Sequence, residues 1–318
     1  MGTERADEHG NFQTERPVGE RRLFFRVIPR VPWQIPGMDT LDATLAGLLV
    51  FGAASVAATG LFRRLRASRR RREWMRDTPF PPRWRKILRR NLPAYHRLPD
   101  GLRGALETKV KRFLADKTFE ACGGLETVSD DMAVTVAGYA CLLVCGRAQA
   151  APFPGLEAIL MYPDSFYSTA PTRGDGPEGV RTASGEHRVG EYDPRGALAL
   201  SWREIRENIA FAGNGRNVVL HEFAHRLDGE DAVVDGVPGG MSPERRAAWR
   251  RDMGAAYARL REDGHHGVLD PYGAREPAEL FAVATEAFFE DAVRFRTVHP
   301  EIHGHFVAYY GLDPATWH

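Results

Sequence analysis

Apolar side chains recur with helical spacing in two stretches of the first half of the chain. In residues 83–121 the repeat predicts an amphipathic helical region. The positions that repeat are Leu106, Val110, Phe113 and Leu114. Residues 130–146 are apolar on nearly every face and follow Ser129, a favourable N-cap, so this stretch predicts a buried helix.

Short apolar runs bounded by turn residues predict strands between residues 155 and 202. One strand is expected within 155–166, centred on residues 159–162. Residues 187–192 and 197–202 predict a hairpin, which follows a loop rich in Gly, Pro, Ser and Thr. These strands would form a small sheet. Its exposed edge could bind an extended peptide or could serve only as scaffold.

The last third of the chain predicts helices that begin at prolines. Ser242 and Pro243 fit the N-cap and the first position of a charged helix that runs to about Arg261. Pro277 fits the first position of another helix. The packing face of that second helix consists of Leu280, Phe281, Val283, Ala284 and Phe288. Helices combined with a small sheet predict an α+β fold that is mainly helical.

The N-terminal region has a different character. Residues 1–42 are polar and of mixed charge, and we expect them to be disordered. Residues 43–62 contain no charged side chain and, as a helix, would be about 30 Å long, the thickness of a bilayer core. Residues 63–73 are rich in arginine, which favours a cytoplasmic location for that end. The sequence therefore predicts a single-pass inner-membrane protein with a transmembrane helix at 43–62 and a cytoplasmic domain over 74–318.

Other interpretations of the N-terminal region stay open. The run 43–62 is rich in Ala and Gly, so its hydrophobicity is modest and a cytoplasmic protein is the alternative. A signal peptide is disfavoured because the run starts late and arginines follow it. Arg21-Arg22 lies about twenty residues too early for a twin-arginine signal. The arginine block could also bind anionic lipid or nucleic acid.

The overall charge argues against a nucleic-acid partner. The chain has 43 Lys and Arg against 42 Asp and Glu, a formal net charge of +1. Its three cysteines, Cys122, Cys141 and Cys145, are too few for a disulfide framework. Cys141 and Cys145 lie in the apolar stretch 130–146, where we expect buried thiols.

The motif that carries the chemistry is His221-Glu222-Phe223-Ala224-His225, an H-E-x-x-H sequence. Its two histidines are four residues apart and would lie on one helical face, where both imidazoles could bind one Zn²⁺ ion. Glu222 lies between them and could take a proton from a metal-activated water as general base. Apolar neighbours indicate a buried helix, in which two unpaired histidines would be costly.

A catalytic zinc site needs a third protein ligand, and a downstream histidine at the expected spacing is absent. Asp228 could orient a ligand, or it could be an ordinary residue of the last helical turn. Glu279 and Glu286 lie seven residues apart on one stripe of the helix that begins at Pro277. A buried carboxylate there needs a partner, and spacing alone does not separate the two.

From about Trp74 to its end, the chain resembles the Mlc titration factor A family, a group of bacterial zinc-dependent peptidases. The matching segments in this sequence are 82–84, 117–120, 123–125, 162–166, 199–202, 217–228, 235–238, 270–272 and 276–283. The resemblance implies a zincin-like domain of the gluzincin type, in which the H-E-x-x-H helix packs on a glutamate helix.

The resemblance also implies roles for individual residues. By matching position, His221, His225 and Glu279 would be the zinc ligands, Glu222 the base, and Tyr272 an oxyanion-stabilising hydroxyl. We therefore expect a zinc metallopeptidase that hydrolyses peptide bonds, with activity resembling that of aminopeptidases. Because the family is associated with a glucose-responsive transcriptional repressor, the alternative is a zinc-stabilised module that sequesters a transcriptional regulator.

Overall fold

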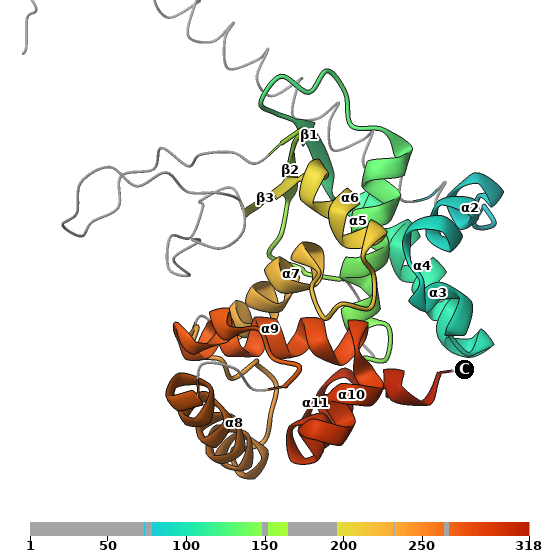
Figure 1. Cartoon of the computed structure of the whole chain (residues 1–318). Coiled ribbons are helices and arrows are strands. Elements are labelled where there is room, and N and C mark those ends of the chain that lie inside the picture. The colour runs from blue at the N-terminus through green and yellow to red at the C-terminus, as the bar shows by residue number, and fades with distance from the viewer. Residues whose placement is uncertain are drawn as a thin grey trace, which may run out of the picture. The chain divides into compact units, whose positions relative to one another are not determined.

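Helices and one small sheet make up the described part of the chain (Figure 1). The computed structural model describes Glu73 and residues 78–147, 152–164, 196–231, 233–263 and 267–317. The α-helices are α2 (Pro82–Asn91), α3 (Ala94–Arg97), α4 (Asp100–Asp116), α5 (Asp130–Val144), α6 (Trp202–Ala210), α7 (Val218–Asp228), α8 (Pro243–Asp263), α9 (Pro277–Glu290), α10 (Ala292–Val298) and α11 (Pro300–Tyr310). The strands are β1 (Thr118–Ala121), β2 (Ala158–Tyr162) and β3 (Ala197–Ser201). Three short 3-10 helices are η1 (Gly229–Asp231), η2 (Pro271–Ala274) and η3 (Pro314–Thr316). The prediction of a mainly helical α+β fold is confirmed for these residues.

The stretch 83–121 is more broken than its hydrophobic repeat predicts. Pro93 and Pro99 stand at the N-caps of α3 and α4, where the chain interrupts its helical hydrogen bonding. After α4, the backbone of Lys117 becomes extended. Its buried ammonium donates to the carbonyls of Phe153 and Leu156 at 2.6 and 2.7 Å. This side chain therefore anchors the turn into β1, and residues 118–121 form a strand rather than helix.

The three strands form a parallel sheet in the order β1-β2-β3. Thr118 pairs with Ala158, and Ala158 pairs with Ala197. The predicted strand at 197–202 is present as β3 (Ala197–Ser201), which lies parallel to β2. The other half of the predicted hairpin, 187–192, lies outside the described residues.

The α7 helix occupies the centre of the core. Phe223 on α7 packs against Phe153 and Phe113, with ring centroids 4.7 and 5.9 Å apart. On another side α7 lies along α9, its principal neighbour (Figure 1). The predicted buried helix after Ser129 is α5, and the Ser129 hydroxyl accepts from the Met132 amide. Aromatic packing on one side and α9 on the other hold α7 in place.

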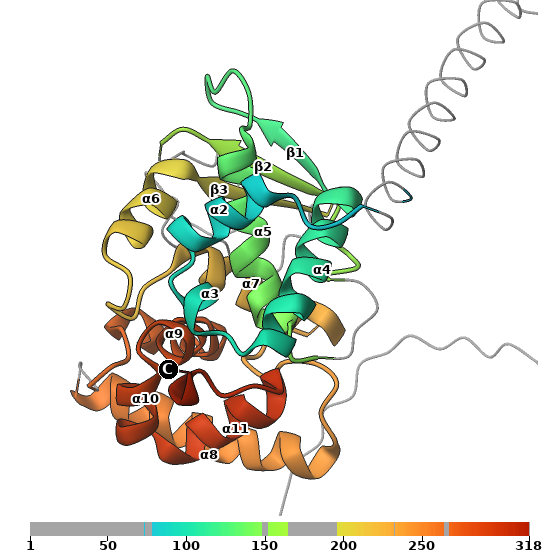
Figure 2. The same cartoon turned by 90° about the vertical axis from the view of Figure 1, so that its right-hand side faces the viewer.

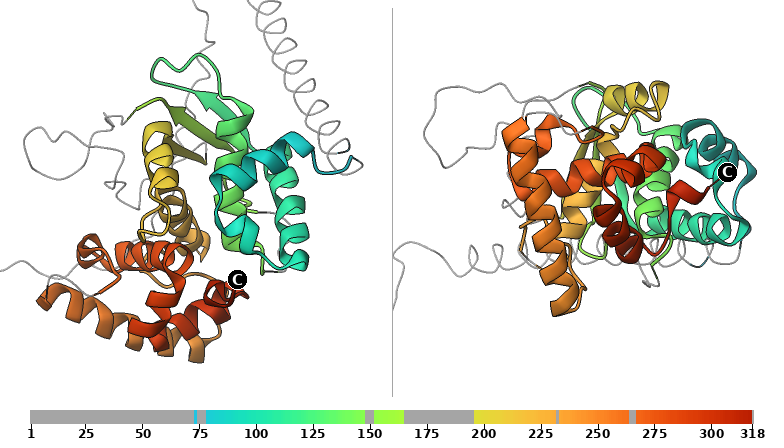
Figure 3. Two further views of the ribbon diagram at one scale, coloured as in Figure 1. Left: turned by 45° about the vertical axis from the view of Figure 1, so that its right-hand side comes forward. Right: turned by 60° about the horizontal axis from the view of Figure 1, so that its bottom comes forward.

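The C-terminal helices gather at the end of the described unit opposite the sheet (Figures 2 and 3). Trp249 of α8 stacks on Phe306 of α11, with ring centroids 5.1 Å apart. The Phe281 ring of α9 lies 5.7 Å from that of Trp249. This aromatic cluster supports α9 from the side away from the sheet, so both faces of the α7–α9 pair are backed by packed side chains.

The prediction of a single-pass inner-membrane protein is corrected by the structure. Among the described helices none combines the length and the apolar surface needed to cross a membrane. Helices α5 and α9 are apolar but contain 15 and 14 residues, short of the roughly 20 that a bilayer requires. Helix α8 has 21 residues but is densely charged. The proposed span at 43–62, with its flanks 1–42 and 63–72, lies outside the described residues.

Candidate metal centre

One buried turn of α7 carries His221, Glu222 and His225. Asn217 caps this helix: its side-chain oxygen accepts from the Leu220 amide at 3.2 Å. The four-residue spacing places both imidazoles on the same face, and their Nε2 atoms lie 3.2 Å apart. Two ring nitrogens thus converge on one point in the interior.

The α9 helix brings a carboxylate to the same point. Glu279 Oε2 lies 3.1 Å from His221 Nε2 and 3.4 Å from His225 Nε2. All three side chains are buried. In the described part of the chain, they form a group of potential metal ligands whose ligand atoms all lie within 4.8 Å of one another.

The spacing of these three atoms fits a tetrahedral metal site. Zinc–ligand bonds of about 2.0–2.2 Å in tetrahedral geometry require ligand atoms roughly 3.3–3.6 Å apart. The separations in this structure are 3.1, 3.2 and 3.4 Å, one within that range and two slightly shorter. Glu279 Oε2 also lacks a properly aligned hydrogen bond from any described residue, although both rings are near. A divalent cation among the three atoms would satisfy it, so the residues present fit the ion.

The electrostatics of the site favour a positive charge. Burial disfavours ionisation of Glu279, but the two imidazoles outweigh that effect and lower its pKa to about 2. Burial disfavours protonation of His221, but Glu279 and Glu286 outweigh it and raise the pKa of the ring. The Glu279 carboxylate therefore stays ionised and stabilises a cation at this position.

Glu286 approaches His221 from the opposite edge of the ring. Its Oε1 lies 2.7 Å from His221 Nδ1, and its Oε2 accepts from the Asn217 amide. The two glutamates that spacing could not separate thus occupy different places. Glu279 faces the Nε2 atoms of both rings, whereas Glu286 holds the far side of one ring.

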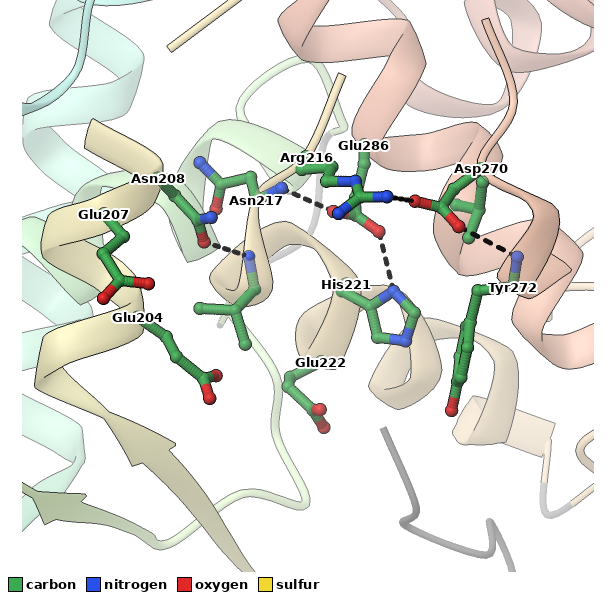
Figure 4. A pocket seen from close by; sticks show the side chains of 12 residues that line it. Glu204, Glu207, Asn208, Arg216, Asn217, His221, Glu222, Asp270, Tyr272 and Glu286 are labelled. Carbon is green, nitrogen blue, oxygen red and sulfur yellow. Dashed lines mark hydrogen bonds and ion pairs between the residues drawn. The ribbon is translucent and has the colours of Figure 1, made fainter. Parts of the chain in front are cut away.

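A cavity of about 470 Å³ opens on this centre. Its lining comes from α6, from the loop before α7, from α7 itself, from η2 with the residue before it, and from α9. Glu222 lines the cavity, is 5% exposed and has no hydrogen-bond or ion-pair partner among the described residues. In Figure 4 the carboxylate of Glu222 and the hydroxyl of Tyr272 lie below the His221 ring, Glu222 to its left and Tyr272 to its right. A substrate in this cavity would therefore meet both groups beside the ligand cluster.

Tyr272 comes from η2, where Asp270 caps the turn by accepting from the Tyr272 amide at 2.9 Å. The ring centroid lies 6.0 Å from that of His221, and the Arg275 guanidinium lies 4.6 Å from the ring centroid on its other side. Burial, followed by the charge of Glu279, raises the pKa of Tyr272 to about 12. The hydroxyl is therefore a proton donor at neutral pH.

Comparison with known proteins gives the family. A family model described as glucose-regulated metallo-peptidase M90 matches residues 65–311. The chain belongs to the M90 family. Because this is a family of metallo-peptidases, the chain is classified as a metallopeptidase, a hydrolase of the protease class that uses a metal ion. The resemblance noted in the sequence is thereby confirmed.

Relatives of this M90 chain include proteins called Mlc titration factor A. An uncharacterized protein of Synechocystis is 35% identical over 240 residues, covering 74% of this chain and 86% of that protein. Mlc titration factor A of Edwardsiella ictaluri is 32% identical over 167 residues, 50% of this chain and 62% of that protein. Its counterpart in Escherichia fergusonii is 29% identical over 242 residues, with coverages of 73% and 87%.

Asp228 has a structural contact rather than a ligand contact in this M90 chain. Its Oδ2 accepts from the Gly236 amide at 2.9 Å. Burial raises the pKa of Asp228 to about 6. The side chain thus joins the end of α7 to the turn at Gly236, which in turn touches the start of α9.

Two histidines of α11 lie beside carboxylates. Buried His303 lies 3.0 Å from Asp313, and His305 lies 2.7 Å from Asp252. These pairs tie α11 to the C-terminal segment and to α8. The pair His265-His266 lies outside the described residues. Buried Cys141 and Cys145 are free thiols, as predicted.

Two residues of the site region, Asn208 and Arg216, were not predicted from the sequence. Asn208 of α6 accepts from the Val218 amide at 2.8 Å and supports the start of α7. Arg216 forms an ion pair with Asp270 at the cavity wall. Each contact joins segments far apart in sequence, so local spacing carries no signal for it. Only the position of Arg216 just before the helix cap hinted at proximity to the site.

Proposed function

We propose that the chain is a zinc-dependent peptidase with His221, His225 and Glu279 as zinc ligands, in a catalytic domain over residues 74–318. The observation that supports this proposal is the convergence of two imidazole nitrogens and one carboxylate oxygen at 3.1–3.4 Å. Two histidines and one glutamate leave a fourth position open, as catalytic zinc sites require. The family membership supports the same class of enzyme.

The mechanism follows from where Glu222 lies. A bound zinc ion would lower the pKa of a water molecule and polarise the peptide carbonyl. Glu222 is buried at the cavity wall beside His221, with no described group competing for its carboxylate. It is therefore placed to take a proton from the attacking water and then to deliver that proton to the leaving amine.

Tyr272 would stabilise the negative charge that develops on the carbonyl oxygen. Its hydroxyl stays protonated because its pKa is raised to about 12. Tyr272 and Glu222 flank the His221 ring (Figure 4). A hydrogen-bond donor aimed at the developing oxyanion stabilises the transition state more than the bound substrate. Such a difference is what accelerates a reaction.

Charge in the cavity supports aminopeptidase-like activity. Glu204 and Glu207 of α6 line the cavity, and Arg216, the one arginine or lysine among its described lining residues, is paired with Asp270. The cavity therefore has an excess of negative charge that would attract the ammonium group of a free peptide N-terminus. A comparison of one peptide with its N-acetylated form tests this point: equal rates for both would exclude recognition of the free N-terminus.

The alternative function is sequestration of a regulatory protein by a zinc-stabilised domain. The name Mlc titration factor A, carried by relatives of this chain, suggests such an interaction for those proteins. The same zinc ligands would then stabilise the fold without hydrolysis. A variant that keeps the zinc but lacks the base separates the two functions.

The substitution Glu222→Gln provides that variant. If the chain is a peptidase, E222Q should keep its zinc and lose hydrolysis by about 10²–10⁴-fold, the usual contribution of a general base. Exposed Glu244 in the first turn of α8 gives the matched control, because Glu244→Gln should leave both properties unchanged. Undiminished hydrolysis by E222Q would exclude the proposed mechanism. If E222Q still supports the cellular response of a regulator, sequestration is the function.

A further inference from the structure

We infer that Glu286 is the positioning residue of the metal centre: it fixes the ring of His221 and holds the start of α7 against α9. This inference rests on the proposed function of His221 as a zinc ligand. Glu286 is 8% exposed and makes two contacts. One oxygen lies 2.7 Å from His221 Nδ1, and the other accepts from the Asn217 amide (Figure 4).

The first contact determines which nitrogen of the ring is available to a metal. Glu286 Oε1 lies 2.7 Å from His221 Nδ1, so in our proposal the carboxylate accepts from the ring and Nδ1 carries the proton. A neutral ring then has its lone pair on Nε2, the atom that faces His225 and Glu279. A carboxylate behind a ligand histidine fixes the ring orientation and increases its basicity.

The second contact fixes the helix that carries the ligand. Asn217 is the N-cap of α7, and its amide donates to Glu286 while its side chain caps Leu220. Glu279 lies seven residues before Glu286 on α9, so both carboxylates belong to the same face of that helix. One side chain of α9 thus sets the position of α7 relative to Glu279. The geometry of the ligand triangle depends on this contact.

Glu290, one turn further along α9, provides a matched comparison. It accepts from the Asn217 side-chain amide at 2.8 Å and from the Gly213 amide at 3.0 Å. It therefore joins α9 to the same cap residue without touching an imidazole. Substitution of Glu290 therefore measures the effect of loosening the α7–α9 contact alone. Substitution of Glu286 loosens the same contact and also releases the His221 ring.

The substitution Glu286→Gln removes one acceptor and adds a donor at the same place. The amide can still accept from Asn217, but its NH₂ group would then face His221 Nδ1 and favour the ring form with the proton on Nε2. That form must lose a proton before it can bind a metal. We expect zinc affinity to fall by about 10–100-fold, the usual effect of removing such a partner.

The experiment compares the full-length wild type, E286Q and Glu290→Gln. Zinc affinity is measured by competition with a chromogenic chelator, and the visible spectrum of the Co²⁺-substituted proteins reports the ligand geometry. Denaturant unfolding of the metal-free proteins measures stability. E286Q should lose affinity and change its Co²⁺ spectrum, whereas E290Q should lose stability but keep the affinity and spectrum of the wild type.

Two results would overturn the inference. The first is an E286Q variant with the zinc affinity and Co²⁺ spectrum of the wild type. The second is an E290Q variant that loses as much zinc affinity as E286Q, which would show that Glu286 has a merely structural role. Should E286Q fail to fold, Glu286→Asp keeps the acceptor but shortens its reach, and an unchanged spectrum in that variant overturns the inference instead. A wild type that binds zinc without cleaving peptides excludes only the proposed function, whereas one that binds no zinc excludes both.

Discussion

Gly236 is the point at which the end of α7 meets the start of α9. Its φ is +76°, and a Cβ atom there would lie 2.4 Å from the carbonyl oxygen of Pro277. Its amide donates to Asp228 at 2.9 Å, and its carbonyl accepts from the Trp249 indole at 2.8 Å. The backbone is therefore held on three sides, and Gly236→Ala should force Pro277 and α9 to move.

The magnitude follows from two costs. An L-residue at this φ costs about 1–2 kcal/mol. The collision with backbone atoms of Pro277 adds about 1–3 kcal/mol, as other overpacked sites do. Gly240 is a matched control because its φ is +80° and no atom lies within 4 Å of the added Cβ. Gly240→Ala should therefore cost only the first amount, and G236A about 2–5 kcal/mol.

Urea unfolding of the metal-free variants measures these differences. Because Pro277 is the first residue of α9 and Glu279 follows two positions later, G236A should also weaken zinc binding, while G240A should not. Equal destabilisation of the two variants, to within about 0.5 kcal/mol, would refute the packing argument. Unchanged zinc affinity in G236A would show that α9 tolerates the shift without moving Glu279.

Three further predictions concern the site. Tyr272→Phe should slow hydrolysis by about 10²–10³-fold at unchanged zinc content, and unchanged kcat would exclude an oxyanion role. Burial raises the pKa of Asp228 from 3.8 to about 6, so its ionisation destabilises the native state fully above that pH and not below about pH 4. Asp228→Asn should therefore stabilise the zinc-free protein by about 1–3 kcal/mol near pH 8 and little near pH 4, as denaturant titrations would show. Zinc at about 100 times its Kd should add roughly 2.7 kcal/mol to the free energy of unfolding, and a chelator should abolish this gain; a melting temperature indifferent to chelator would contradict it.

Local signals were sufficient for the helices that carry the site. Pro277 begins α9, as predicted from the preference of proline for the first helical position, and the H-E-x-x-H motif lies on a helix, α7, as predicted. The sheet was harder, because parallel pairing joins β1, β2 and β3 across long intervening segments. Strand β1 is also mostly exposed and has no alternating apolar pattern, so its four residues resembled the end of a helix.

At the site, too, the contacts between residues far apart in sequence could not be predicted from local patterns. His221, Glu222 and His225 share one helical turn, so their proximity follows from spacing alone. Glu279 and Glu286 are separated by about two turns and share one face of α9. Which of them meets the Nε2 atoms depends on how far α9 is shifted along α7. That shift results from tertiary packing, which no local pattern records.

The zinc content of the purified chain tests the central claim most directly. Elemental analysis should find one zinc ion per chain in the wild type and in Glu276→Gln, an exposed control three residues before the ligand. Glu279→Ala should lose most of that zinc, because two imidazoles alone hold it weakly. Full zinc occupancy in Glu279→Ala, or none in the wild type, would contradict the proposed metal centre.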